Sequence, residues 1–543
     1  MRVESTVLGE KMKRSVPVAL AAVALTVLSA CGGSPDVASD GGEPQAGGTL
    51  RYALSQAPTC SDPAQSGTNQ TVYVARQIVD SLTDQDPDSG EITPWLAQSW
   101  EVNSDATSFT FTLKDGVTFS DGTPVDAEAV KANFDSIVNS LGAAKAQLGA
   151  SYLAGYTGTT VVDPLTAQVD FSAPNAQFLQ ATSTPQLGLQ GKATTDKPAE
   201  ERCLGDNVGS GPFVYSSYQQ DRAITLNKRT GYNWGSEVFG HDGEAYLDAI
   251  DFTIVPESGV RTGSLASDQL DAISDALPQD APQIEAVGGR VLTTSNPGTP
   301  FGLTPNFERP VLGDIEVRRA LIPALNRQEL VDTVLGPNFL PATGTLAVKT
   351  PQYVQLDDVT YDPDKSREIL DTAGWVPGAD GIREKNGQRL TFSVTFSDVF
   401  AGNQSILELV QQQLSEVGVE LVLNRVTTPE ALAAQNTGDY DSTYGNSTRA
   451  DGDILRTSYA LEGRNNNRRG PIPALDEALA QQLATTDPEQ RKEILADAQE
   501  LVLDNGLLIP TIELSQAIGA GPNVHDLKFE ASARLQFFDT WLG

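Results

Sequence analysis

Histidine, cysteine and methionine are scarce in this chain of 543 residues, which holds two, three and two of them. A protein-built metal centre needs several nitrogen or sulfur ligands, and a Ser–His pair needs an available base, so both are disfavoured by number. Neither a G-x-S-x-G nor an H-E-x-x-H pattern occurs, which disfavours two common kinds of hydrolytic site. We expect no cofactor and no resident metal.

Basic residues are also few, because 37 Lys and Arg face 71 Asp and Glu, for a formal net charge of −34. A surface of that sign repels phosphate backbones, so we expect no nucleic-acid partner. The acidity suits solubility outside the cell better than recognition. A carboxylate-dependent hydrolase stays open at this point, since acids are abundant but no particular pair is marked.

Long apolar runs are lacking, with one exception near the N-terminus. Basic residues at 11–14 precede an apolar run over 16–28, and Ser29-Ala30-Cys31 follows. This order is typical of a secretory signal, and its end resembles the bacterial lipobox, in which the cysteine is acylated. We expect residues 1–30 to be a cleaved signal peptide. Cys31 would then anchor an otherwise soluble protein to the outer face of the bacterial cytoplasmic membrane.

The segment 31–47 is rich in Gly, Pro, Ser and Asp, which predicts a flexible lipidated tether. Cleavage after residue 30 removes four basic and two acidic residues, so the mature net charge becomes −36. Two cysteines, Cys60 and Cys203, then remain besides Cys31. In an oxidising compartment such a pair favours a disulfide.

Periodicity predicts strands and helices mixed along the remaining chain. Thr49–Leu54 alternates as a strand, and Phe109, Phe111 and Leu113 share one face of another. Asp126 is placed to cap a helix, and a second helix opens at Asp362 before a proline. This is an α/β pattern with antiparallel hairpins, and about 500 residues suggest two or three subdomains.

Four blocks along this body carry a resemblance. Residues 95–134 contain FTFTLKDGVTFSDGTPVDAEAVKANF, 209–213 read GSGPF with YNW at 232–234, 306–321 end in DIEVRRAL, and 361–375 begin YDPD and end AGW. In order and spacing they resemble family 5 of the extracellular solute-binding proteins, the peptide/nickel/opine class that serves ABC importers. No block is specific alone, but the series is.

The resemblance implies a type II periplasmic-binding-protein clamshell, with two lobes and an extra subdomain inserted in lobe I. Two chain crossings would join the lobes, near residues 295–300 and 500–510. The implied division is lobe I at 48–85, 205–297 and 505–543, the inserted subdomain at 86–204, and lobe II at 298–504.

The resemblance also implies that the protein is a monomer that binds a solute and is not an enzyme. It would capture a small solute between its lobes and deliver it to the permease subunits of an ABC importer. An oligopeptide, an opine-like compound or another small polar or anionic compound would fit. A receptor for a chelated metal such as nickel is the main alternative, and the secreted hydrolase is a weaker one.

Candidate ligand contacts come from the same resemblance, at Asn306 and in the segment 440–456. Tyr440, Tyr444 and Asn446 offer the aromatic and amide groups that suit a pocket, although packing of the two tyrosines in the core is an equal alternative.

Arg449 is the most distinctive residue of that segment. Many peptide-binding members carry a tryptophan and then an aspartate there, where this chain has Asn446 and Arg449. Arg449 is therefore predicted to pair a carboxylate or phosphate of the ligand. The alternative is an ion pair with Asp451 or Asp453 at the rim.

Overall fold

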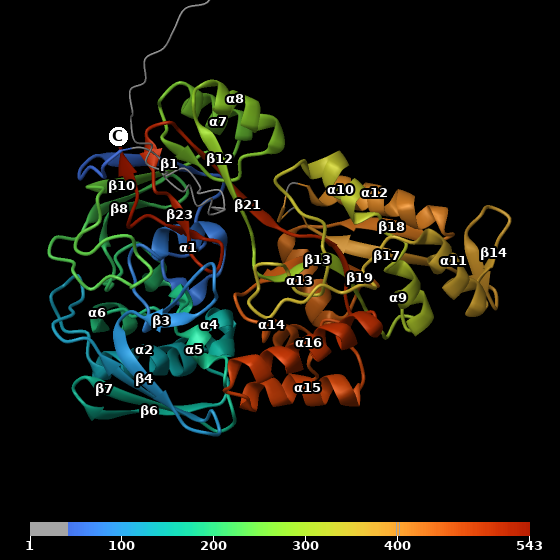
Figure 1. The fold of residues 1–543 in the computed structure, drawn as a ribbon, viewed down its shortest axis with the longest axis horizontal. Coiled ribbons are helices and arrows are strands. Elements are labelled where there is room, and N and C mark those ends of the chain that lie inside the picture. The colour runs from blue at the N-terminus through green and yellow to red at the C-terminus, as the bar shows by residue number, and fades with distance from the viewer. Residues whose placement is uncertain (1–41, 398, 401) are drawn as a thin grey trace, which may run out of the picture. The chain divides into compact units, whose positions relative to one another are not determined.

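Two large sheets, each with its own core, organise the protein (Figure 1). The computed structural model describes residues 42–397, 399–400 and 402–543, so the predicted signal peptide, Cys31 and most of the tether lie outside the described residues. Residues 43–543 form one compact unit. We call the part around the seven-stranded sheet lobe I and the part around the five-stranded sheet lobe II.

The sheet of lobe I is mixed, and the predicted strand at Thr49–Leu54 is at its centre. This strand runs parallel to both of its neighbours, and its Leu50, Tyr52 and Leu54 side chains are fully buried. The strands in spatial order are β12 (Arg290–Ser295), β21 (Ser515–Ala520), β11 (Ala272–Ile273), β1 (Thr49–Leu54), β10 (Ala249–Ile254), β9 (Ala223–Lys228) and β8 (Phe213–Gln219).

An antiparallel four-stranded sheet forms a second layer of lobe I. Its strands are β4 (Ala97–Val102), β5 (Ser108–Leu113), β7 (Thr166–Phe171) and β6 (Tyr156–Asp163). As predicted, β5 buries Phe109, Phe111 and Leu113 on one face, and Phe178 packs edge-on against Phe109 with ring centroids 5.0 Å apart. The Asp126 carboxylate accepts the Ala129 amide at 2.9 Å and caps α2 (Ala127–Asp135).

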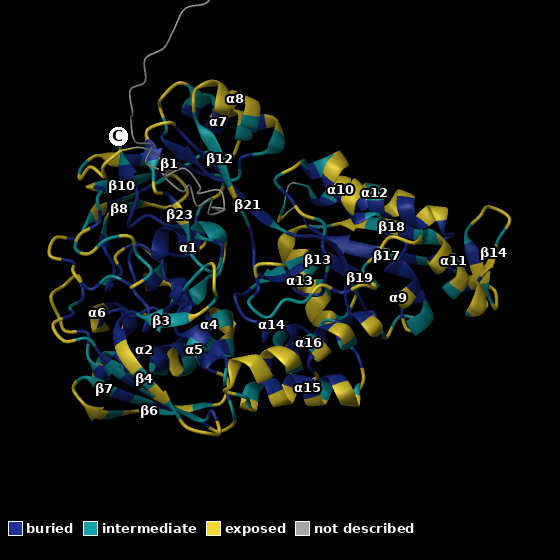
Figure 2. Ribbon diagram, in the orientation of Figure 1, coloured by how far each residue is buried: buried dark blue, intermediate teal, exposed yellow. Residues whose placement is uncertain are grey.

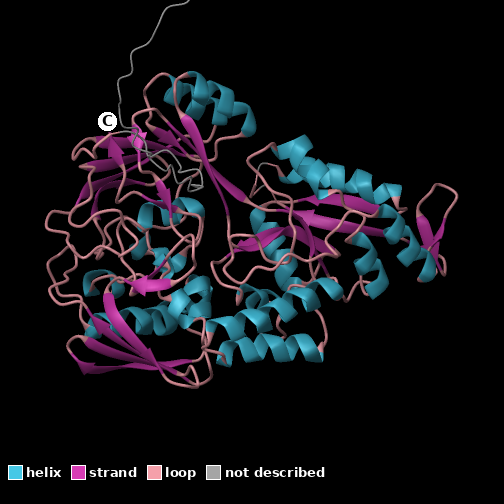
Figure 3. Ribbon diagram, viewed as in Figure 1, coloured by secondary structure: helices cyan, strands magenta, loops and turns pink. Residues whose placement is uncertain are grey.

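The sheet of lobe II is also mixed, and helices flank it (Figure 3). The helix α11 (Pro363–Thr372) begins after the Asp362 cap, and α12 (Asn403–Glu416) buries Ile406, Val410 and Leu414. The strands in spatial order are β18 (Glu420–Arg425), β17 (Thr391–Phe396), β19 (Ser442–Thr448), β13 (Gly298–Pro305) and β20 (Ile509–Ile512).

A helical layer of lobe II packs around a smaller core of its own. It comprises α14 (Ile454–Tyr459), α15 (Pro473–Ala484) and α16 (Pro488–Asp504). The outward faces of α15 and α16 are exposed, whereas the central strands of both lobes are buried (Figure 2). No helix among the described residues is both long and apolar enough to cross a membrane.

The chain passes between the two sheets twice. It leaves β12 and enters β13 through 296–297, and it leaves β20 and enters β21 through 513–514. The second crossing lies C-terminal to the predicted interval 500–510. The reason is that α16 extends to Asp504 and that β20 still pairs with β13 of lobe II before the chain crosses.

Candidate functional site

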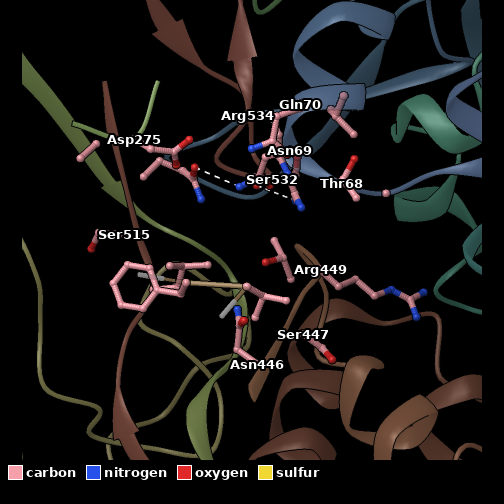
Figure 4. A pocket seen from close by; sticks show the side chains of 18 of the residues that line it. Thr68, Asn69, Gln70, Asp275, Asn446, Ser447, Arg449, Ser515, Ser532 and Arg534 are labelled. Atoms are coloured by element: carbon pink, nitrogen blue, oxygen red, sulfur yellow. Dashed lines mark hydrogen bonds between the residues drawn. The ribbon is translucent and has the colours of Figure 1, made fainter. Parts of the chain in front are cut away.

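A cavity of about 1330 Å³ lies between the two lobes. Lobe I contributes the start of α1 (Asn69–Ala75) and the segment 530–534, and lobe II contributes the end of β19. Figure 4 shows Asn69, Ser532 and Arg534 on one side of this cavity and Asn446, Ser447 and Arg449 on the other. Concave sites of this size between domains are where small ligands bind.

A chain of hydrogen bonds joins the lobes beside the cavity, at the crossings. The Tyr73 hydroxyl donates to the side-chain oxygen of Gln516 at 2.7 Å, and the Gln516 amide donates to Asn296 at 2.7 Å. Asn296 in turn donates to the Thr448 hydroxyl of lobe II at 3.1 Å. Polar groups buried at the crossings are thus satisfied by one another, which holds the two crossing strands in register.

Contacts also join the lobes on the inserted-subdomain side. The Gln85 side chain donates to the Ala450 carbonyl at 3.1 Å, and the Ala176 amide donates to the Leu483 carbonyl at 2.8 Å. The cavity is therefore bounded at the crossings and again by this second set of contacts.

One wall of the cavity is aromatic. Phe400 packs against Phe301 and Phe339, with ring centroids 5.7 and 5.8 Å apart, and all three line the cavity. The rest of the lining is mostly polar. A ligand with an apolar portion and a polar or charged portion would match this division.

Arg449 lines the cavity but is also held by the protein itself. Its guanidinium pairs with Asp453 at 2.9 Å and donates to the Gln177 side chain of lobe I. It also lies over the Tyr152 ring of lobe I, 4.6 Å from the centroid. The alternative pairing with Asp453 is thus present, within the interface between the lobes rather than at an exposed rim, since Arg449 is 4% exposed.

The carboxylate of Asp453 is shared among several donors. Arg456 and the Gln482 amide contact it as well, each at 2.6 Å. Because Arg449 and Arg456 are so close, the pKa of Asp453 is lowered despite the burial that opposes it. The cluster keeps an ionised carboxylate beside Arg449 and offsets much of its positive charge.

The other predicted ligand contacts divide between the cavity and the core. Asn446 lines the cavity. Asn306 is fully buried outside the lining, where its amide donates to the Gly438 and Tyr440 carbonyls. The Tyr440 hydroxyl donates to Asn466, and the Tyr444 hydroxyl pairs with Thr511. The side chains of Asn306 and of the two tyrosines make contacts within the protein core. Their positions therefore do not support a role in ligand binding.

Several cavity residues have no local signal in the sequence. Tyr152, Arg464 and Arg534 line the cavity but come from α4 (Gln147–Tyr152), from the segment after α14 and from the C-terminal segment. Each is an ordinary residue in its own stretch of chain, and only the fold brings the three to one cavity.

Cys60 and Cys203 form a disulfide, as predicted. It ties the segment that follows β1 to the 3-10 turn Glu201–Cys203, which precedes β8. No cluster of three or more His, Cys, Asp or Glu that could hold a metal ion occurs among the residues that the structure describes.

The fold and the interlobe cavity are those of a type II periplasmic binding protein. The profile described as bacterial extracellular solute-binding proteins, family 5 Middle, matches residues 91–469. The chain belongs to this family, whose members are the solute-binding proteins of ABC importers rather than enzymes.

Individual relatives are distant but match over most of their length. The nickel-binding periplasmic protein of Escherichia coli K12 is 24% identical, over 85% of this chain and 88% of its own. Protein XP55 of Streptomyces lividans is 28% identical, over 91% and 89%. The crystal structure of NikA from Brucella suis in complex with Fe(III)-EDTA superposes with a TM-score of 0.78 at 22% identity, covering 91% of this chain and all of that one.

Proposed function

We propose that the chain is a lipid-anchored receptor that captures a small polar or anionic solute between its lobes and delivers it to an ABC permease. The observation that carries the proposal is the cavity of about 1330 Å³ lined by both lobes. Two short crossings connect the lobes, so a ligand that contacts both would favour a closed arrangement. Such a ligand binds the closed form better than the open one.

A lipid on Cys31 fits this role. A receptor held at the membrane stays concentrated near its permease without a tight interface between them. The family assignment supports export, and the lipid itself rests on the signal at residues 28–31.

A chelated metal is a second candidate ligand. The relative from Escherichia coli is named for nickel, and the structure from Brucella suis holds Fe(III)-EDTA. A chelator brings its own metal ligands, which agrees with the lack of a three-residue metal cluster among the described residues. The chelator would then be recognised as an organic anion.

Thermal unfolding with a panel of compounds tests the function. The mature protein is melted with di- and tripeptides, opines, sugars, small carboxylates and chelated nickel, and the radius of gyration is measured by small-angle scattering. A ligand at 100 times its Kd should stabilise the protein by about 2.7 kcal/mol and should reduce the radius without being consumed. If no compound changes either quantity, or if one is turned over, solute capture is contradicted.

A further inference from the structure

The cavity carries an excess of positive groups within a strongly acidic protein. Five arginines and three carboxylates line it, although the chain as a whole has almost twice as many acids as bases. Some of these charges are already used. Glu530 pairs with Arg76 at 2.8 Å, and Arg449 pairs with Asp453. Arg261 is buried and donates to the Val255, Pro256, Ser274 and Asp275 carbonyls.

Arg534 is held in place by neutral groups only. Its Nε donates to the side-chain oxygen of Asn69 at 3.0 Å, and Nη1 donates to the Ser532 carbonyl at 2.9 Å. It forms no ion pair with any residue in the described part of the chain, and Nη2 has no hydrogen-bond partner there. Burial lowers the pKa of Arg534, and Glu530 is among the groups that oppose this effect, although the Glu530 carboxylate is paired with Arg76. The Arg534 guanidinium is thus held in one orientation, and its Nη2 group remains available to donate hydrogen bonds.

Arg464 enters the cavity from lobe II. It follows α14, and its backbone amide donates to the Thr457 carbonyl at 3.1 Å. Within the described chain its guanidinium has neither an ion pair nor a hydrogen bond to another side chain. Partial burial lowers its pKa, and Tyr152 is the group that opposes this effect. Arg464 and Tyr152 thus line one cavity from opposite lobes, Arg464 from lobe II and Tyr152 from lobe I.

Tyr152 lines the same cavity as the two arginines and lies beside Arg449. Its ring is 4.6 Å from the Arg449 guanidinium and is 4% exposed, whereas its hydroxyl forms no hydrogen bond with the described residues. Burial raises the pKa of Tyr152, and Arg449 and Arg534 act against that rise. The hydroxyl therefore stays protonated near neutral pH and is a donor without an acceptor.

We propose that Tyr152, Arg464 and Arg534 form a subsite for a carboxylate of an organic anion. Two guanidinium groups and one hydroxyl, each with unused donors, match the several lone pairs of a carboxylate. Tyr152 and Arg534 belong to lobe I and Arg464 to lobe II, so one carboxylate would bridge the lobes. The proposal names the substrate class of the proposed solute receptor and rests on that function.

The cavity favours an organic anion over a free inorganic one. Its volume of about 1330 Å³ exceeds what one phosphate ion fills, and the aromatic wall of Phe301, Phe339 and Phe400 offers apolar surface to the rest of the ligand. Inorganic phosphate carries the negative charge but has no organic portion to contact the aromatic wall. It is therefore included in the test as a comparison compound.

The test compares carboxylates with their neutral amides. Citrate, succinate and L-glutamate, the amides of the same three compounds, and inorganic phosphate are each added to the mature protein, and the thermal midpoint and Kd are measured. At least one carboxylate should bind, with its amide and phosphate binding at least tenfold more weakly. Arg464→Gln and Arg534→Gln should each weaken that carboxylate by roughly 10- to 100-fold, and Tyr152→Phe by a smaller factor.

A matched control removes an arginine elsewhere. Arg222 is exposed and does not line the cavity, so Arg222→Gln should leave the Kd unchanged. Far-ultraviolet circular dichroism checks that each variant is folded. If phosphate binds as tightly as the carboxylate, the subsite recognises a free inorganic anion rather than an organic one, and the proposal is overturned.

The remaining outcomes separate the subsite from the receptor function. If none of the three carboxylates binds, or if both Arg→Gln variants bind them normally, the subsite is overturned. Binding of a neutral peptide or sugar in that case keeps solute capture intact. If no compound of either class binds, the receptor function fails as well.

Discussion

Arg449 contacts both lobes, and these contacts determine how its substitution should change the stability of the protein. Its charge is matched by Asp453 within lobe II, and Tyr152 and Gln177 contact it from lobe I. Its Nε is buried without a partner among the described residues. We infer that Arg449 mainly stabilises the contact between the lobes, beside whatever ligand the cavity holds.

Arg449→Ala should lower the free energy of unfolding by about 3 kcal/mol, because a buried ion pair loses one partner. Arg456→Ala is a suitable control, since Arg456 contacts the same carboxylate but is more exposed and does not contact lobe I through any described bond. Its loss should be about 1 kcal/mol. Urea unfolding measures both, and equal losses would assign the effect to Asp453 rather than to the interlobe contact.

Glu513 is a buried carboxyl at the second crossing. It is fully buried, its Oε1 accepts the Val348 amide at 3.0 Å, and its Oε2 has no hydrogen-bond partner in the described part of the chain. Burial raises its pKa from 4.5 to about 7, against smaller opposing effects of the Val348 amide and the Ser295 hydroxyl. No charged side chain contributes to this shift.

The shift predicts how stability depends on pH. Between pH 4.5 and 7 the folded protein keeps a proton on Glu513 that the unfolded chain has lost, so the free energy of unfolding falls as the pH rises through this window. The total loss is about 3 kcal/mol. Glu513→Gln should therefore be more stable than the wild type at pH 8 and similar at pH 5.

Urea unfolding at several pH values measures this difference. Asp80 is a second buried carboxyl whose pKa is raised to about 7, and it lies in the core of lobe I, so Glu513→Gln should remove only part of the slope. Asp80→Asn should remove a further part, and buried Asp84, whose pKa burial also raises, should keep some of the slope. An unchanged slope in Glu513→Gln would show that this carboxyl is ionised throughout.

Secondary elements were predictable wherever the signal is local. The strand at Thr49–Leu54, the buried face of β5 and the cap of α2 all depend on residues within a few positions of one another. The second crossing was placed too early, because the pairing of β20 with β13 joins residues about 200 positions apart. No local pattern records such a pairing.

The lining of the cavity was less predictable for the same reason. Asn446 and Arg449 were found because the family resemblance points to one strand, and both line the cavity. Tyr152 lies more than 300 positions before Arg464, and Arg464 lies 70 positions before Arg534, so only tertiary packing brings the three residues to one cavity. The resemblance also pointed to Asn306 and Tyr440, whose side chains instead satisfy backbone and core contacts.

The disulfide acts at the scale of elements, because it links two segments of lobe I that are 143 residues apart. Closing a loop of that length restricts the unfolded chain, which corresponds to a stabilisation of up to about 5 kcal/mol. The double change Cys60→Ser and Cys203→Ser should lower the free energy of unfolding by about 3 to 5 kcal/mol. Urea unfolding with and without a reductant measures it. The variant should not respond to the reductant, and a wild type that did not respond either would contradict the prediction.

At the scale of the whole molecule, the chain consists of two lobes that are joined by two short crossings. Each lobe has its own core, so relative motion disturbs little packing. The described interlobe contacts are mostly hydrogen bonds at the crossings and near Arg449. In the proposed function, a ligand held by both lobes would add to these contacts, and a permease would distinguish the closed form from the empty receptor.

The predicted lipid anchor at Cys31 can be tested by its effect on the location of the protein. Cys31 lies outside the described residues, and the expectation that it carries lipid rests on the basic, apolar and small residues that precede it. In cells, a Cys31→Ser chain from which residues 1–30 have been cleaved should move from the membrane fraction to the soluble exported fraction, because neither the lipid nor the apolar run of the signal peptide remains. The purified Cys31→Ser protein should bind its solute with unchanged Kd, since the cavity begins beyond residue 54. Uptake of that solute should nevertheless fall, because the receptor is no longer concentrated at the permease. A Cys31→Ser variant that has lost residues 1–30 and still stays in the membrane fraction would show that another part of the chain provides the anchor.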